Sequence, residues 1–226
     1  MARMARVVVA NLPHHVVQRG AGRVRLFAGP ADYRLYLELL GECSWKYGLE
    51  IHAYCLMPDH LHLVCVPRRR SALAGATKEV GRRYARYVGK MRRLRGDLWA
   101  GRPQSCVLDR AHAWEAVRHV EQCPVRGGKA RRAERYRWSS AAGHCGLRED
   151  GVLSGGLEKR GVVKNWARWL KAGGDEAMVD AIRRRTRTGR PAGSKAFVER
   201  IERKTRRNLT PRPPGRPKKG RKAKRR

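Results

Sequence analysis

The side chains with the clearest chemical potential are His60 and His62, which directly follow the turn-forming residues Met57-Pro58-Asp59. Residues i and i+2 of a strand point to the same face of a sheet. A strand beginning at His60 would therefore turn both imidazoles to one side and Leu61 to the other. Two imidazoles on one face make half of a divalent-metal site. The His-x-His pattern alone is unspecific, because two exposed polar residues on an open sheet face would have the same spacing.

A second pair, His119 and Cys123, is spaced four residues apart at the end of a predicted helix, so the two share a helix face. Together with His60 and His62 they would form a set of three histidines and one cysteine, which favours Zn²⁺ over Mg²⁺. Four filled positions would make that site structural. The alternative for Cys123 is a packed residue at a helix end. The six cysteines include no Cys-x-x-Cys pair, so we expect reduced thiols rather than a zinc finger or a disulfide framework.

The elements that must position these side chains follow from hydrophobic periodicity. The pattern predicts strands over 14–18, 49–57 and 60–66, a further strand within 98–108, and helices over 32–47, 71–93 and 111–122. Ser71 is a candidate N-cap for the second of these helices. The order β-α-β-β-α-β followed by a helix predicts an α+β, ferredoxin-like fold, with one antiparallel sheet and helices on one face.

Composition divides the chain into three parts. We expect the ferredoxin-like domain to occupy residues 7–147. A small helical extension is expected at 148–207, with helices over 162–172, 175–187 and 194–204. The last part, 208–226, combines Pro and Gly with a high density of Lys and Arg, and it is expected to be disordered in isolation.

The chain is strongly basic, and the charge is unevenly spread. Of 226 residues, 53 are Lys or Arg and 19 are Asp or Glu, which gives a formal net charge of +34. Residues 183–226 hold 20 of these bases and two of the acids. Such a charge indicates a polyanionic partner, and nucleic acid is the first expectation. No run approaches the roughly 18 uncharged apolar residues of a membrane span, so we expect a cytoplasmic, nucleoid-associated protein with no membrane partner.

The basic side chains expected to contact DNA fall into three groups. They are a pair flanking a Gly-Ala-Gly loop (Arg19, Arg23), a helical group (Arg82, Arg83, Arg86) and a C-terminal group (Arg190, Arg216, Lys218, Lys219). The C-terminal group includes two Gly-Arg-Pro tripeptides that resemble an AT-hook, in which an extended backbone places Arg in the narrow minor groove of A·T-rich duplex DNA. Simple solvation of a charged surface is the alternative for each group, and a structural role is a further alternative for the first tripeptide, which contains Arg190.

The stretch HAYCLMPDHLHLV (52–64) resembles the core signature of the single-tyrosine HUH (IS200-like) transposases, and most closely that of their REP-associated tyrosine transposase branch. Other stretches agree with that branch in the same order: HHVVQRGAGR (14–23), LWAGRPQS (98–105), RHVEQCPVRGG (118–128), RWSSAAGH (137–144), TGRPAGSKAFVERIE (188–202) and GRPKK (215–219). Each motif is weak alone, whereas the ordered set covers nearly the whole chain.

The resemblance implies a reaction as well as a fold. In this family a divalent metal, Mg²⁺ or Mn²⁺, is held by the two histidines, here His60 and His62, and by a polar residue on a later helix. The metal polarises the scissile phosphate of single-stranded DNA, whose ends are folded as hairpins. A tyrosine then attacks the phosphorus, and strand cleavage and transfer carry out DNA transposition. A basic protein associated with RNA or the ribosome would explain the charge but not this run of motifs.

The chain departs from the family pattern at the nucleophile. Aligning RHVEQCPVR (118–126) with the family motif puts His119 at the tyrosine position and Cys123 at the position of the third ligand, commonly Asn or Gln. None of the seven tyrosines lies between 88 and 135. Three hypotheses follow: a domesticated, catalytically inactive DNA-binding protein, a substituted nucleophile in which neutral His119 attacks the phosphodiester, or a nucleophile relocated to Tyr84 or Tyr87. The target sequence, the metal and the oligomeric state stay open.

Overall fold

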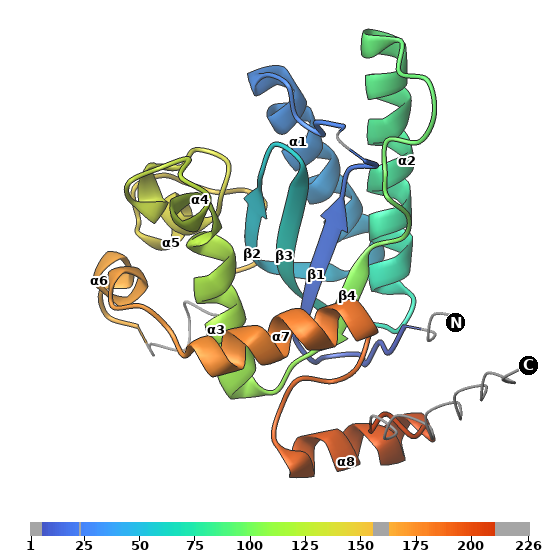
Figure 1. The fold of residues 1–226 in the computed structure, drawn as a ribbon, viewed down its shortest axis with the longest axis vertical. Helices are drawn as coiled ribbons and strands as arrows, with labels where there is room; N and C mark the ends of the chain where they lie inside the picture. The colour runs from blue at the N-terminus through green and yellow to red at the C-terminus, as the bar shows by residue number, and fades with distance from the viewer. Residues whose placement is uncertain (1–5, 23, 156–162, 211–226) are drawn as a thin grey trace, which may run out of the picture.

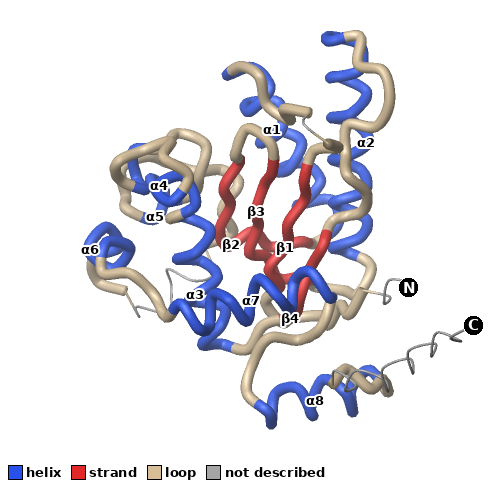
Figure 2. The backbone as a smooth tube through the Cα atoms, viewed as in Figure 1, coloured by secondary structure: helices blue, strands red, loops and turns tan. Residues whose placement is uncertain are grey.

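A four-stranded antiparallel sheet forms the centre of the molecule, with the strand order β2-β3-β1-β4 (Figures 1 and 2). The structure is a computed structural model, and it describes residues 6–22, 24–155 and 163–210. The strands are β1 (His14–Arg19), β2 (Leu49–Leu56), β3 (His60–Pro67) and β4 (Gln104–Val107). This element order and antiparallel sheet confirm the predicted α+β, ferredoxin-like fold.

The register of the sheet decides which side chains share a face. His62 lies opposite Val17 of β1 and Cys55 of β2, and His15 lies opposite Cys106 of β4. Because directly paired residues point to the same side, His15, Cys55, His60 and His62 all lie on one face. The intervening residues, including Leu61, point to the other.

Two long helices cover the face that carries Leu61: α1 (Pro30–Tyr47) and α2 (Ala72–Arg92). Proline is tolerated at the first position of α1 because the first N–H groups of a helix have no intrahelical acceptor. Gly48 ends the helix with φ of 68°, a conformation that suits glycine. The predicted Ser71 cap is wrong in detail, since its hydroxyl makes no capping hydrogen bond.

The opposite face is covered as well, by α3 (Arg110–Glu121) and by α7 (Glu176–Thr188), which contacts β4, β1 and α3 (Figure 1). The prediction of helices on one face thus holds for α1 and α2 and leaves out this second layer. The buried side chains on this face are small or apolar, as at Ala53, Cys55, Val64 and Cys106, and such a surface needs a cover. Although α7 lies outside the expected domain range 7–147, it packs directly on that sheet.

The remaining elements are short or peripheral: α4 (Cys123–Arg126), the 3₁₀-helix η1 (Ala133–Arg135), α5 (Ala141–His144), α6 (Trp166–Lys171) and α8 (Lys195–Thr205). The packed chain reaches into the expected tail, because Leu209 is buried and its N–H donates to Glu202 Oε1 at 2.6 Å. Within the described ranges, no helix is long and apolar enough to cross a membrane.

Candidate functional site

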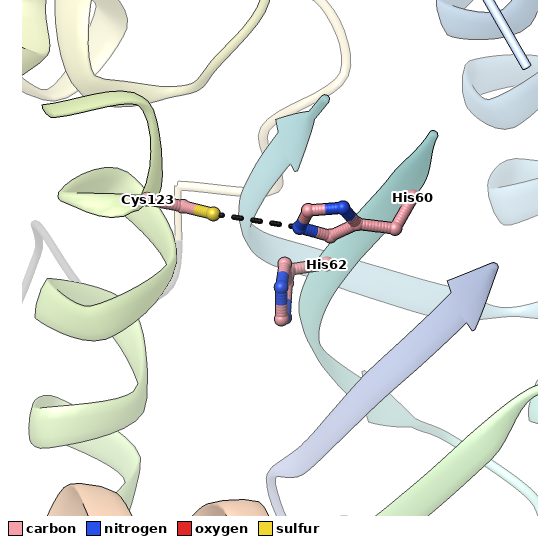
Figure 3. Close-up of side chains that lie close together, drawn as sticks. All are labelled: His60, His62 and Cys123. Atoms are coloured by element: carbon pink, nitrogen blue, oxygen red, sulfur yellow. Dashed lines mark hydrogen bonds between the residues drawn. The ribbon is translucent and has the colours of Figure 1, made fainter. Parts of the chain in front are cut away.

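The structure brings His60, His62 and Cys123 together at one end of the sheet (Figure 3). The two histidines begin β3 directly after the turn at Pro58-Asp59, and strand alternation turns both toward α3 and α4. One candidate ligand atom from each of the three residues lies within 4.8 Å of the others, and His60 Nε2 is 3.7 Å from Cys123 Sγ. This is the only such group of His, Cys, Asp or Glu side chains among the residues that the structure describes.

Cys123 owes its position to the break between α3 and α4. The first helix ends at Glu121, and Cys123 opens the second, in which Pro124 occupies the first turn. Proline there removes an N–H that a continuous helix would have used. The chain turns at this point and holds the thiol toward β3 and Cys55.

Asp59 and Cys55 form hydrogen bonds with two of these side chains, and both contacts favour metal binding. Asp59 Oδ1 accepts a hydrogen bond from His60 Nδ1 at 2.8 Å, which leaves His60 Nε2 facing Cys123. A hydrogen bond from the Cys55 thiol lowers the pKa of Cys123 against the opposing effect of burial, with further help from His60 and His62. The Cys55 pKa is raised, first by burial and then by this contact. A thiolate and two imidazoles in this arrangement fit a divalent metal, and a soft one best.

His119 lies beside this cluster, on the last turn of α3. Its ring stands edge-on to His62 at 5.7 Å and to His15 at 6.1 Å between centroids. Burial, with further contributions from Arg126 and His62, lowers the pKa of His119 to about 2, so the imidazole is neutral at neutral pH. It is 6% exposed, and its Nδ1 has no hydrogen-bond partner in the described part of the chain. The residue at the expected nucleophile position is thus next to the candidate metal ligands.

Sequence reasoning missed His15 and Thr186. His15 Nε2 lies 3.0 Å from His62 Nδ1, with the two nearly coplanar ring centroids 5.3 Å apart, and His15 Nδ1 lies 2.8 Å from Thr186 Oγ1 on α7. Burial, followed by the charges of His62 and His119, lowers the pKa of His15 well below its usual value. The signal for His15 is its place in the alternation of the first strand, whereas no local pattern marks Thr186.

Relocation of the nucleophile to α2 does not fit the geometry. That helix packs on the opposite face of the sheet from the two histidines. Tyr84 is fully buried there, and its hydroxyl donates to the Leu26 carbonyl at 2.8 Å. Tyr87, on the same helix, has its pKa raised by burial and by Asp32 of α1.

The predicted DNA-contacting residues separate into different environments. Arg82 lines a groove of about 760 Å³ between α2 and the segment before β4. Arg83 instead pairs with Glu42 of α1. Arg86 is exposed on α2, and Arg19 is exposed at the end of β1. Arg190 donates to the Leu209 carbonyl at 3.1 Å. The remaining four, Arg23, Arg216, Lys218 and Lys219, lie outside the described residues.

The groove around Arg82 has a uniform charge. Its ionisable lining residues are all cations and include no carboxylate, and its floor holds Gln18, Gly81 and Trp99. Trp99 donates its indole N–H to the Gly81 carbonyl at 2.9 Å, which fixes the ring against α2. A fixed aromatic ring among cations is suited to nucleic acid. The five cations of the groove are Arg6, Arg70, Lys78, Arg82 and Arg102.

A family comparison covers the residues that form the sheet. Residues 8–117 match the family model described as "Transposase IS200 like". The match includes all four strands and both His60 and His62, and it ends just before His119 and Cys123. Through residues 8–117, just under half of the chain, this protein is similar to the IS200-like transposases, a family whose activities are DNA binding and DNA transposition.

One solved structure supports the fold. A REP-associated tyrosine transposase bound to a REP hairpin is similar with a TM-score of 0.56 at 13% identity, covering 66% of this chain and 88% of that chain. A candidate transposase from Deinococcus radiodurans R1 aligns at 22% identity over 54% of this chain and 97% of that chain, with a TM-score of 0.35. No curated protein matches the chain.

Proposed function

We propose that this protein binds hairpin-forming single-stranded DNA as a REP-associated type of IS200-like transposase, and that it holds a divalent metal with His60, His62 and Cys123. The observation that carries the proposal is the convergence of these three side chains with His119 on one face of the sheet. The similar hairpin-bound REP-associated transposase supports the choice of DNA partner. A chromosomal DNA target would place the protein at the nucleoid.

The donor set bears on the identity of the metal. Mg²⁺ and Mn²⁺ prefer oxygen ligands, whereas a thiolate with two imidazoles favours Zn²⁺. If a metal were bound by these three residues, it would still have room for a ligand from outside the protein. A metal bound there would supply Lewis-acid polarisation of the scissile phosphate. Within the protein, Asp59 orients His60, and Cys55 stabilises the Cys123 thiolate.

His119 is the proposed nucleophile at the tyrosine position. A neutral imidazole nitrogen can attack phosphorus, and the lowered pKa keeps this ring neutral. Attack would form an N–P bond and break the P–O3′ bond, and the released 3′-oxygen would take a proton. The product would be a 5′-phosphohistidine with a free 3′-hydroxyl, ready for rejoining.

The second candidate function is DNA binding without cleavage. One observation favours it: His119 carries no hydroxyl and is almost fully buried, so a phosphate can reach its ring only if the neighbouring side chains move. In this case the fold and the basic groove would be kept as a hairpin-binding module, and strand transfer would be lost.

A covalent-trapping experiment tests both functions. The full chain and a His119→Tyr variant are incubated with labelled single-stranded hairpins from the flanks of their gene, with Zn²⁺, Mn²⁺ or Mg²⁺, and run on a denaturing gel. A native adduct that peptide mass mapping places on His119 would support cleavage. An adduct from His119→Tyr alone would support the binding module. Absence of both an adduct and salt-sensitive hairpin binding would contradict the proposed function.

A further inference from the structure

A buried chain of hydrogen bonds runs from the candidate metal site to the C-terminal helix α7. Its members are His62 of β3, His15 of β1 and Thr186 of α7. The contacts are 3.0 Å from His62 Nδ1 to His15 Nε2 and 2.8 Å from His15 Nδ1 to Thr186 Oγ1. All three residues are buried, with exposures of 7%, 1% and 2%. Neither His15 nor Thr186 belongs to the ligand cluster, and Thr186 lies beyond the family match, which ends at residue 117.

Metal binding would fix the direction of both hydrogen bonds that link His62, His15 and Thr186. A neutral imidazole carries one N–H donor and one acceptor nitrogen. If His62 binds the metal through Nε2, its proton must sit on Nδ1, which then donates to His15 Nε2. His15 must in turn carry its proton on Nδ1 and donate it to Thr186 Oγ1. The hydroxyl of Thr186 is the end acceptor that makes this order self-consistent.

We propose that Thr186, acting through His15, is a positioning residue that selects the His62 tautomer and aims its Nε2 at the metal. This inference rests on the proposed metal site. Hydrogen-bond partners of metal-binding histidines typically change metal affinity 10- to 100-fold when they are removed. Helix α7 thereby contributes to the candidate metal site, although it lies far from the His-x-His motif in sequence.

The geometry of the surroundings supports an orienting role. The His15 and His62 rings are nearly coplanar, with an interplanar angle of 16°, and this is the arrangement that an in-plane hydrogen bond between their nitrogens requires. Thr186 is held in turn, because its Oγ1 lies 3.1 Å from Cys106 Sγ on β4. Each link therefore comes from a different element, and α7 packs on β1 and β4, the strands that carry His15 and Cys106.

The test measures Zn²⁺ affinity of the full chain by chelator competition and records the visible spectrum of the Co²⁺-loaded protein. Thr186→Val keeps the shape of the side chain and removes the acceptor. His15→Phe keeps a planar aromatic ring without nitrogens. Both are expected to weaken Zn²⁺ binding about 10- to 100-fold and to alter the Co²⁺ bands. Thr186→Ser keeps the hydroxyl and should retain Zn²⁺ affinity to within about twofold of the native value. If Thr186 acted only through packing, loss of its methyl group in this variant would weaken binding instead.

Two controls separate the outcomes. Thr188→Val lies on the same helix, where the Thr188 hydroxyl bonds only to the helix carbonyls of Arg184 and Arg185, so its Zn²⁺ affinity should equal that of the native protein. Nitrogen-15 spectra of the Zn²⁺-loaded imidazoles should place the protons of His15 and His62 on Nδ1. Native metal affinity in Thr186→Val and His15→Phe, or an Nε2 proton on His15, would overturn the inference. Failure of the native chain to bind metal would overturn the metal site itself.

Discussion

At the scale of single residues, the candidate metal site depends on two imidazoles and one thiolate. Replacing His60 and His62 together by Ala is expected to lower Zn²⁺ affinity by more than about 100-fold, because losing ligands costs more than losing their hydrogen-bond partners. Hairpin affinity should fall little, since the basic groove lies elsewhere. Equilibrium dialysis and fluorescence anisotropy measure the two quantities. His112→Ala, at the far end of α3, is the control, and unchanged metal binding in the double variant would contradict the site.

A second residue-scale prediction concerns Glu121, the fully buried last residue of α3. Its carboxylate accepts hydrogen bonds from Ser140, His144 and Trp166, the last at 2.7 Å. Glu121→Ala removes the shared acceptor of these donors, so we expect the free energy of unfolding to fall by about 3–5 kcal/mol. Urea denaturation measures this loss. Glu121→Gln keeps an acceptor oxygen and should cost less, and equal losses would argue against the network.

At the scale of elements, neighbouring arginines of α2 lie in different environments: Arg82 lines the basic groove, and Arg83 does not. Arg82→Ala is expected to weaken hairpin binding and to reduce the magnitude of the salt slope by about 0.9, the value for one phosphate contact on duplex DNA. Arg83→Ala is the matched control, because Arg83 is adjacent in sequence but pairs with Glu42 on α1. Anisotropy titrations at several salt concentrations measure both. Equal effects of the two changes would mean that the groove does not contact the DNA.

A cut after Thr210 tests the basic C-terminal segment and keeps every residue that the structure describes. Leu209 is buried, and Glu202 accepts hydrogen bonds from the N–H groups of Leu209 and Thr210. Deleting 211–226 removes nine Lys or Arg residues. We expect weaker binding to DNA of every sequence and a shallower salt dependence. The thermal midpoint should be unchanged, and an unchanged salt slope would show that the segment does not contact DNA.

Periodicity predicts the elements well because each helix or strand is a local pattern. The ends of α7 and α8 fall within one residue of the predicted ranges, and strand alternation correctly places His60 and His62 together. What sequence could not supply is contact between distant segments. His15 and Thr186 are 171 residues apart, and only the sheet register and the docking of α7 bring them together. The different environments of Arg82 and Arg83 likewise depend on where α1 packs.

At the scale of the whole molecule, buried histidines make stability depend on pH. Burial lowers the pKa of His14 to about 4 and that of His119 to about 2, against 6.5 in the unfolded chain. Below pH 6.5 the unfolded state therefore binds more protons than the folded state, and stability falls as pH falls. His14 and His119 should each lower the free energy of unfolding by about 2 kcal/mol between pH 6.5 and 5.

Urea unfolding of the metal-free protein at pH 7, 6 and 5 measures this loss. The lowered pKa values of Asp59 and Asp109 act below this range. The lowered pKa of Cys123 adds to the loss in the same direction, and the raised pKa of His60 opposes it. A free energy of unfolding that stays constant from pH 7 to 5 would show that the folded and unfolded states bind protons equally, which would contradict the lowered histidine pKa values.

The docking of α7 on the sheet also has a consequence for biosynthesis. The first strand leaves the ribosome early, whereas Thr186 is added after more than four fifths of the chain has been made. Until α7 emerges, the face carrying His15 and His62 lacks one of its covering helices, and long-range contacts of this kind form late in folding. A nascent chain, or one that ends before α7, would therefore carry the His-x-His strand without this support, so a completed site would mark a protein translated at least through α7.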